Sequence, residues 1–179
     1  MMKPGHEQLR PTGPAIPQAK RLSSPGAALR APQSRRSLSE LPVDERSPTV
    51  LVVDDNQENC DLYRECLTRL GFRVVDASDG ATAIQRALAD EPDVIVMDLA
   101  MPVMDGYTAT RLLKSDQKTR AIPIVVLTAA GMDQHGRAEA AGCDVFLVKP
   151  CALDDLEGVL RSCVQLRRDD RSSSPALTR

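Results

Sequence analysis

Residues 94–106 read VIVMDLAMPVMDG, in which a wholly apolar run, Val94–Met97, stops at an aspartate and gives way to a loop. An apolar run without polar alternation is typical of a strand that is covered on both faces, as in a parallel sheet flanked by helices. Asp105 and Gly106 follow a Met-Pro pair and are turn residues. We therefore predict a buried parallel strand over 94–97, with Asp98 at its carboxyl end.

Strands and helices are predicted to alternate on both sides of this run. Short apolar runs predict four more strands, at residues 49–53, 72–76, 122–127 and 145–148. Apolar side chains at helical spacing predict five helices, at residues 62–70, 81–88, 107–113, 132–141 and 153–166. Gly71 and Gly142 are suited to end the first and fourth helices. Five strand–helix units with right-handed crossovers predict an open, doubly wound α/β sheet.

Polar residues follow four of the predicted strands, at the edge where such sheets bind their ligands: Asp54 and Asp55, Asp98, Thr128, and Lys149. Each residue has an ordinary explanation when it is taken alone, since an aspartate after a strand is often a helix cap and a lysine is often a surface charge. Together they are less easily explained. Three converging carboxylates repel one another and call for a cation. An all-oxygen cluster suits Mg²⁺, so we predict a magnesium site here.

Four segments occur in the order of one known family: VLVVDDN (50–56), VIVMDLAMPVMDG (94–106), VVLTA (125–129) and FLVKP (146–150). With them the chain resembles the receiver domain of two-component response regulators over roughly residues 49–165. The resemblance implies a flavodoxin-like fold with five parallel strands in the order 2-1-3-4-5. It also implies a cis peptide bond between Lys149 and Pro150.

The resemblance assigns a role to each residue at the strand ends. It implies that Asp98 accepts a phosphoryl group, and that Asp54, Asp55 and Asp98 hold Mg²⁺ together with the main-chain carbonyl of Ala100. Thr128 and Lys149 are expected to contact the phosphoryl oxygens. Phe146 takes the place of the aromatic residue that switches position with Thr128.

The implied phosphoryl donor is a phosphohistidine on a sensor histidine kinase or a histidine phosphotransfer protein. The domain is expected to catalyse only its own phosphorylation and dephosphorylation, so we do not class it as an enzyme. Thirteen residues follow Leu166. We therefore expect a stand-alone receiver that signals through a partner protein or passes its phosphoryl group onward.

Other functions remain open at this stage. A phosphorylation-independent adaptor would share the fold without using Asp98 as an acceptor. An aspartyl phosphatase on the same fold would carry a second carboxylate two residues after its nucleophile, where this chain has Ala100. A flavodoxin would place a Ser/Thr-rich phosphate loop after the first strand, where the acidic Asp54-Asp55 pair would repel the flavin phosphate.

The composition sets outer limits on the function. A formal net charge of −2 favours neither a nucleic-acid partner nor a membrane surface, and no apolar run is long enough to span a bilayer. The five cysteines are odd in number and lack a C-x-x-C pair, which indicates reduced thiols in the cytoplasm. Residues 1–48 hold eight of the 13 prolines and are expected to be disordered, as are residues 167–179. The receiver domain is therefore expected to span residues 49–166.

Overall fold

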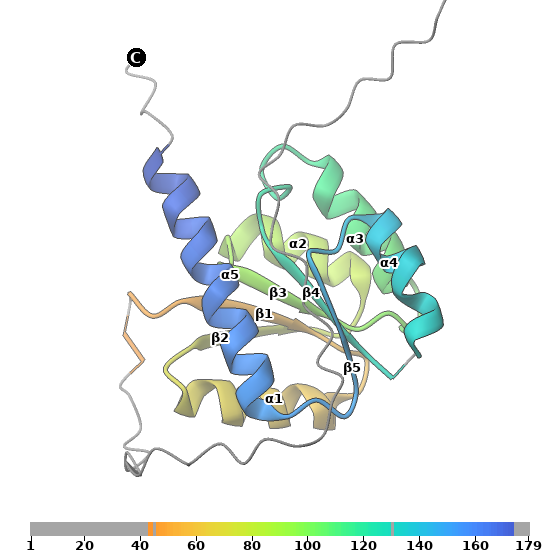
Figure 1. The fold of residues 1–179 in the computed structure, drawn as a ribbon, viewed down its shortest axis with the longest axis horizontal. Helices are drawn as coiled ribbons and strands as arrows, with labels where there is room; N and C mark the ends of the chain where they lie inside the picture. Colours follow the sequence, from red (N-terminus) through yellow and green to blue (C-terminus); the bar gives the residue numbers. More distant parts are fainter. Residues whose placement is uncertain (1–42, 45, 130, 174–179) are drawn as a thin grey trace, which may run out of the picture. The chain divides into compact units, whose positions relative to one another are not determined.

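A computed structural model describes residues 43, 44, 46–129 and 131–173, apart from the side chains of residues 132, 170, 171 and 173. Strands and helices alternate along these residues from β1 to α5, as the sequence predicts (Figure 1). Most of segment 1–48 and residues 174–179, for which we expect disorder, lie outside the described residues, so their disorder stays a prediction. For residues 167–173 the expectation of disorder is wrong, because these residues belong to α5.

The strands form a parallel sheet in the order β2-β1-β3-β4-β5, which confirms the predicted flavodoxin-like topology. Their bounds are β1 Thr49–Val53, β2 Arg73–Ala77, β3 Val94–Met97, β4 Ile124–Thr128 and β5 Val145–Val148. β3 lies at the centre, where Val96 is in register with Val52 of β1 and Val125 of β4. Every residue of β3 is buried, as its apolar run predicts.

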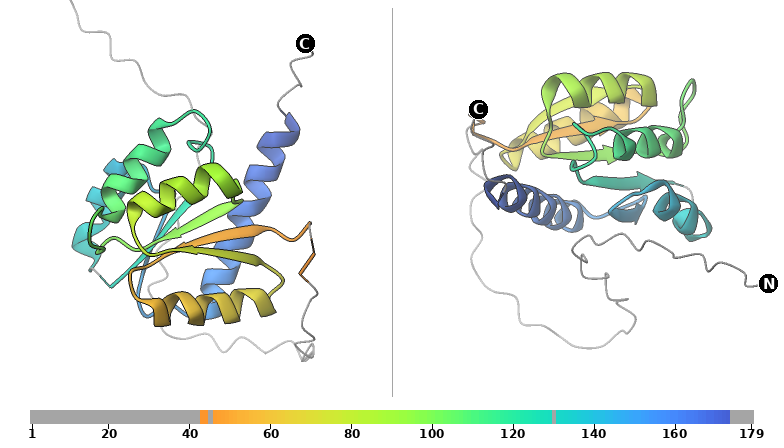
Figure 2. Two further views of the ribbon diagram at one scale, coloured as in Figure 1. Left: turned by 180° about the vertical axis from the view of Figure 1, so that it is seen from behind. Right: turned by 90° about the horizontal axis from the view of Figure 1, so that it is seen from above.

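The helices cover both faces of the sheet, with α1 and α5 on one face and α2, α3 and α4 on the other (Figures 1 and 2). Their bounds are α1 Gln57–Arg69, α2 Gly80–Asp90, α3 Gly106–Ser115, α4 His135–Ala141 and α5 Leu153–Ser173. Because successive strand residues face opposite ways, Val50 and Val52 pack in the core beneath α1 and α5. Leu51 and Val53 pack in the core beneath α2 and α3. None of the helices in the described ranges is both long and apolar enough to cross a bilayer.

Short polar residues and glycines mark the helix ends. Asn56, Asp79 and Asp105 cap α1, α2 and α3, and each side chain accepts a hydrogen bond from a backbone N–H of the first turn. Gly71 and Gly142 follow α1 and α4 with φ angles of 84° and 101°, a conformation that favours glycine. The predicted helix ends at these two glycines are therefore confirmed.

Several element bounds differ from the sequence prediction, and three of the differences are informative. β4 begins at Ile124 instead of residue 122, because Pro123 has no N–H to donate to the sheet. α5 continues past the predicted end at Leu166, to Ser173, so residues 167–173 are helical. Arg167 is 6% exposed, which shows that the buried face of α5 continues beyond its last leucine although the sequence there is mostly charged. The predicted fourth helix also begins as a 3-10 turn, η1 (Met132–Gln134).

Candidate functional site

The carboxyl ends of the strands bring the predicted acidic residues together. One carboxylate oxygen from each of Asp54, Asp55 and Asp98 lies within 4.8 Å of the other two. Asp54 follows β1 and is 4% exposed, and Asp98 follows β3 and is 8% exposed, whereas Asp55 is open to solvent. The neighbouring strands β1 and β3 thus hold two buried carboxylates side by side, and Asp55 adds an exposed third one.

Lys149 provides the positive charge of this cluster. Its ammonium nitrogen lies 2.5 Å from Oδ2 of Asp54 and 3.9 Å from Oδ1 of Asp98. Burial alone would lower the pKa of Lys149, but the hydrogen bond to Asp54 and the charges of Asp98 and Asp54 outweigh it and raise that pKa above its usual value. Lys149 therefore carries its charge at neutral pH. The peptide bond to Pro150 is cis, which confirms that expectation.

One carboxylate oxygen of Asp98 is buried and accepts no hydrogen bond within the described part of the chain. Among the residues that the structure describes, none donates a hydrogen bond to Oδ1 of Asp98. The backbone of Asp98 is fixed, since its N–H donates to the carbonyl of Val53 at 2.9 Å. A buried carboxylate oxygen without a donor is unfavourable unless another group supplies positive charge.

The cluster has the properties of a magnesium site. It offers one carboxylate oxygen from each of three aspartates, all within 4.8 Å of one another. Hard divalent cations prefer such oxygens, and Mg²⁺ binds through one or two carboxylates while it keeps several waters. The residues present therefore fit a magnesium ion.

The loop between β3 and α3 is held close to Asp98 by glycines. A Cβ atom at Gly106 would lie 2.0 Å from the carbonyl oxygen of Asp98, so no larger residue fits there. A Cβ atom at Gly80, in α2, would lie 2.8 Å from the carbonyl oxygen of Met104. Both glycines are needed for close backbone approach, and they pack the loop between β3, α2 and α3.

Val103 occupies a strained position in the same loop. Its φ angle is 66°, and the N–H of Met104 donates to the carbonyl of Pro102 at 2.7 Å across it. This pattern is a γ-turn with positive φ, which is unfavourable for a β-branched residue. The side chain of Val103 is 92% exposed, so packing does not offset the strain. Ala100, three residues before Val103 in the same loop, is exposed.

Thr128 and Phe146 lie on the side of the site that faces α4. Thr128 ends β4 and is fully buried, and its carbonyl accepts a hydrogen bond from the N–H of Lys149 at 2.8 Å. Phe146 is half-buried in β5, and its ring meets that of His135 edge-on at 5.2 Å. Both residues thus adjoin the segment that joins the site to α4.

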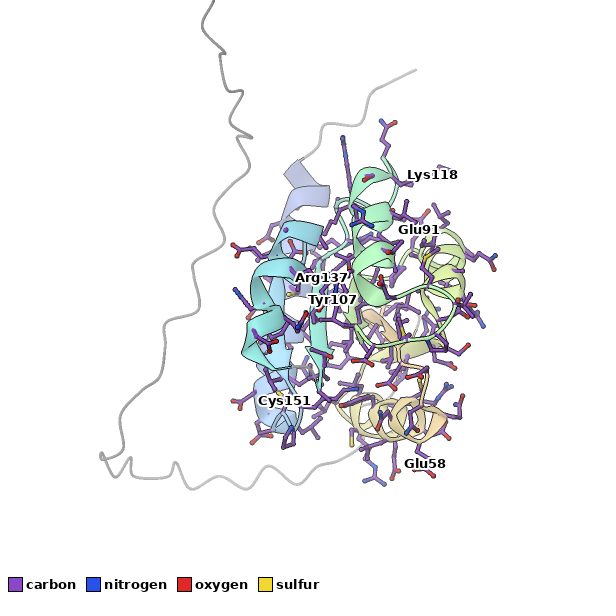
Figure 3. The ribbon with its side chains drawn as sticks, turned by 90° about the vertical axis from the view of Figure 1, so that its right-hand side faces the viewer. Glu58, Glu91, Tyr107, Lys118, Arg137 and Cys151 are labelled. Atoms are coloured by element: carbon purple, nitrogen blue, oxygen red, sulfur yellow. The ribbon has the colours of Figure 1, made fainter. Side chains whose placement is uncertain are left out.

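Sequence reasoning missed four residues around this site: Asn59, Tyr107, Gln134 and Arg137. Asn59, in the first turn of α1, donates to both oxygens of Asp54. Tyr107 of α3 hydrogen-bonds Gln134 at 2.9 Å and lies beneath the guanidinium of Arg137, which is 4.0 Å from the ring centre (Figure 3). Tyr107, Gln134 and Ala100 line a cavity of about 380 Å³ beside the site. These contacts join separate elements, so neither periodicity nor a strand end indicates them.

Comparison with known proteins agrees with the fold and the site. A sequence profile described as the response regulator receiver domain matches residues 50–161. The response regulator PleD of Caulobacter vibrioides is 42% identical over 111 residues, which are 62% of this chain and 24% of PleD. The polar-differentiation response regulator DivK of Brucella ovis is 31% identical over 106 residues, which are 59% of this chain and 86% of DivK. The chain thus spans about a quarter of PleD.

A solved structure with the same fold contains a metal ion at its own site. It is the receiver domain of the sensor histidine kinase PA1611 from Pseudomonas aeruginosa, described with a magnesium ion coordinated in its active-site cleft. It is 32% identical to this chain, covers 66% of it and is itself covered to 98%, with a TM-score of 0.63. With the profile match, the sheet order and the clustered aspartates, these likenesses show that the chain belongs to the family of response regulator receiver domains.

Proposed function

We propose that this receiver takes a phosphoryl group onto Asp98 in a two-component phosphorelay. The observation that carries the proposal is Oδ1 of Asp98, a buried oxygen without a hydrogen-bond donor, 3.9 Å from the ammonium of Lys149. An ionised carboxylate oxygen in this position is a nucleophile whose lone pair is not already engaged. It would form a bond to phosphorus while the bond from phosphorus to the donor imidazole breaks, and the imidazole leaves.

Mg²⁺ is proposed to bind at Asp54, Asp55 and Asp98, with the carbonyl of Ala100 as a further ligand. When bound, the ion would offset negative charge on the phosphoryl oxygens. The protein contributes the rest. Lys149 carries a charge that can reach a phosphoryl oxygen on Asp98, and the Thr128 hydroxyl can donate to another oxygen.

The first test measures whether a small donor modifies the protein. Incubation with acetyl phosphate and Mg²⁺ should add one phosphoryl group to the intact mass, and EDTA should prevent the gain. Asp98→Asn should abolish the modification because the nucleophile is lost. Asp61→Asn, which changes an exposed aspartate of α1, should be modified like the wild type. An unmodified wild type would favour the phosphorylation-independent adaptor, and a modified Asp98→Asn would exclude Asp98 as the acceptor.

The proposed partner upstream is a sensor histidine kinase or a histidine phosphotransfer protein. Support comes from the family and from the solved relative, which is itself the receiver of a sensor histidine kinase. We place this exchange in the cytoplasm. All five cysteines carry free thiols, which suits a reducing compartment. The domain would also hydrolyse the acyl phosphate on its own Asp98. This reaction would end the signal, and it involves no separate substrate.

We propose further that the face of α4, β5 and α5 changes when Asp98 is phosphorylated. α4 is short, and its buried side chains are the alanines Ala138 and Ala141, which give it little apolar area. Phe146 packs against the same cluster of buried residues and touches His135. If Thr128 moves toward the phosphoryl group, the space that it leaves is available to the Phe146 ring. An element with so little anchoring can be shifted by one new contact.

An NMR comparison with and without beryllofluoride, a phosphoryl mimic, tests this output face. Amide shifts should concentrate in residues 128–155 as well as around Asp98, because the switch links them. The face of α2 supplies an internal control, and the chemical shifts of its amides should not change. Shifts confined to the loops at Asp54, Asp98 and Lys149 would show that the domain does not signal through α4 and β5.

A further inference from the structure

The side-chain amide of Asn59 bridges the two oxygens of Asp54. Its nitrogen lies 3.1 Å from Oδ1 and 3.1 Å from Oδ2. Only the nitrogen can face both oxygens, because the amide carbonyl would repel a carboxylate. Asn59 is half-buried in the first turn of α1, five positions after Asp54, so the turn capped by Asn56 carries it back over the end of β1.

Asp54 receives its hydrogen bonds from two sides. From the α1 side, the backbone N–H of Asn56 donates to Oδ1 at 2.9 Å, and Asn59 donates to both oxygens. From the β5 side, Lys149 pairs with Oδ2 at 2.5 Å. The donors from α1 are neutral and Lys149 is the charged one. The buried carboxylate is therefore held by two kinds of contact with different electrostatic consequences.

The two kinds of contact should respond differently to the phosphorylation of Asp98. The ammonium of Lys149 contacts Asp54 and lies 3.9 Å from Asp98, so a phosphoryl group on Asp98 would draw it away from Oδ2. Asp54 would then lose its charged partner while it stays buried. The neutral amide of Asn59 can continue to donate, and it adds no positive charge that would repel a divalent cation.

We propose that Asn59 is a positioning residue that holds the Asp54 carboxylate in place for Mg²⁺, both before phosphorylation and when Lys149 turns toward the phosphoryl group. This inference rests on the proposed function, since it needs a cation at Asp54 and a phosphoryl group at Asp98. Groups that orient a metal ligand typically change metal affinity by about 10–100-fold when they are removed. Within the described part of the chain, Asn59 hydrogen-bonds to Asp54 and to neither of the other two aspartates. Its removal should therefore weaken the binding of Mg²⁺ without removing a metal ligand.

The experiment compares Asn59→Leu, which keeps the shape and removes the donor, with Gln57→Met, the same kind of change on an exposed amide of the same helical turn. Isothermal titration calorimetry should give a Kd for Mg²⁺ about tenfold higher in Asn59→Leu. Gln57→Met should stay close to the wild type. In the acetyl phosphate assay, the Mg²⁺ concentration for half-maximal rate should rise by the same factor, and the rate at saturating Mg²⁺ should largely recover.

A higher Mg²⁺ requirement with a recovered rate at saturating Mg²⁺ indicates a positioning role. A general loss of structure would instead lower the rate at every Mg²⁺ concentration. Asn59→Ala serves as a second variant if leucine disturbs the turn, because alanine favours helix and also removes the donor. Unchanged or tighter Mg²⁺ binding in a folded variant would overturn the role of Asn59 while the proposed function stands. A wild type that neither binds Mg²⁺ nor gains a phosphoryl group would overturn both.

Discussion

Lys149→Met should slow the Mg²⁺-dependent phosphorylation of Asp98 by about 10²–10³-fold, the usual effect of removing one group that stabilises charge in a transition state. Methionine keeps most of the side-chain length and loses the ammonium, which lies 3.9 Å from Oδ1 of Asp98. The negative charge that develops on the phosphoryl oxygens then lacks its fixed positive partner. The rate constant with acetyl phosphate at saturating Mg²⁺, followed by intact mass, measures the effect.

The same substitution should tighten Mg²⁺ binding. Without Lys149 the three carboxylates lose the cation that now pairs with Asp54 at 2.5 Å, so a divalent ion meets a more negative site. A slower reaction together with a lower Kd for Mg²⁺ distinguishes this account from unfolding, which would weaken both. Lys118→Met, at an exposed lysine, should change neither quantity. A Lys149→Met protein that reacts at the wild-type rate would contradict the role given to Lys149.

Gly106→Ala should strongly destabilise the domain. The new Cβ would lie 2.0 Å from the carbonyl oxygen of Asp98 and 2.9 Å from Cα of Leu99. Both contacts are with backbone, which cannot rotate away as a side chain can. We expect the free energy of unfolding to fall by about 3 kcal/mol, at the upper end for overpacked positions.

Urea denaturation monitored by circular dichroism measures this loss. Gly158→Ala, in α5, is the matched control, because a Cβ there meets nothing within 4 Å. The control should gain about 0.5–1 kcal/mol, since alanine is favoured over glycine inside a helix. A Gly106→Ala protein as stable as the wild type would show that the loop after Asp98 does not approach β3 as closely as described.

The sequence predicted the sheet and the strand-end residues well, because both depend on local patterns. An apolar run such as Val94–Met97 indicates by its composition that the strand is buried. The carboxyl ends of parallel strands must then meet at one edge of the sheet. The positions of Asp54, Asp98 and Lys149 follow from that rule alone. Their proximity in the structure therefore needed no knowledge of side-chain packing.

Features that depend on contacts between distant segments could not be predicted from the sequence. Lys149 pairs more closely with Asp54 than with Asp98, a preference that no local sequence pattern indicates. The strained φ of Val103 goes against the preference of a β-branched residue, so local propensity points the wrong way. The extension of α5 includes Arg167, whose burial its charge does not suggest.

The central claim is that Asp98, and not one of its two acidic neighbours, accepts the phosphoryl group. Borohydride reduces an aspartyl phosphate to homoserine, so peptide mass spectrometry after phosphorylation and reduction locates the acceptor. We expect homoserine at position 98 in the wild type treated with acetyl phosphate and Mg²⁺, and none without the donor. Homoserine at position 54 or 55, whose oxygens lie within 4.8 Å of those of Asp98, would contradict the account.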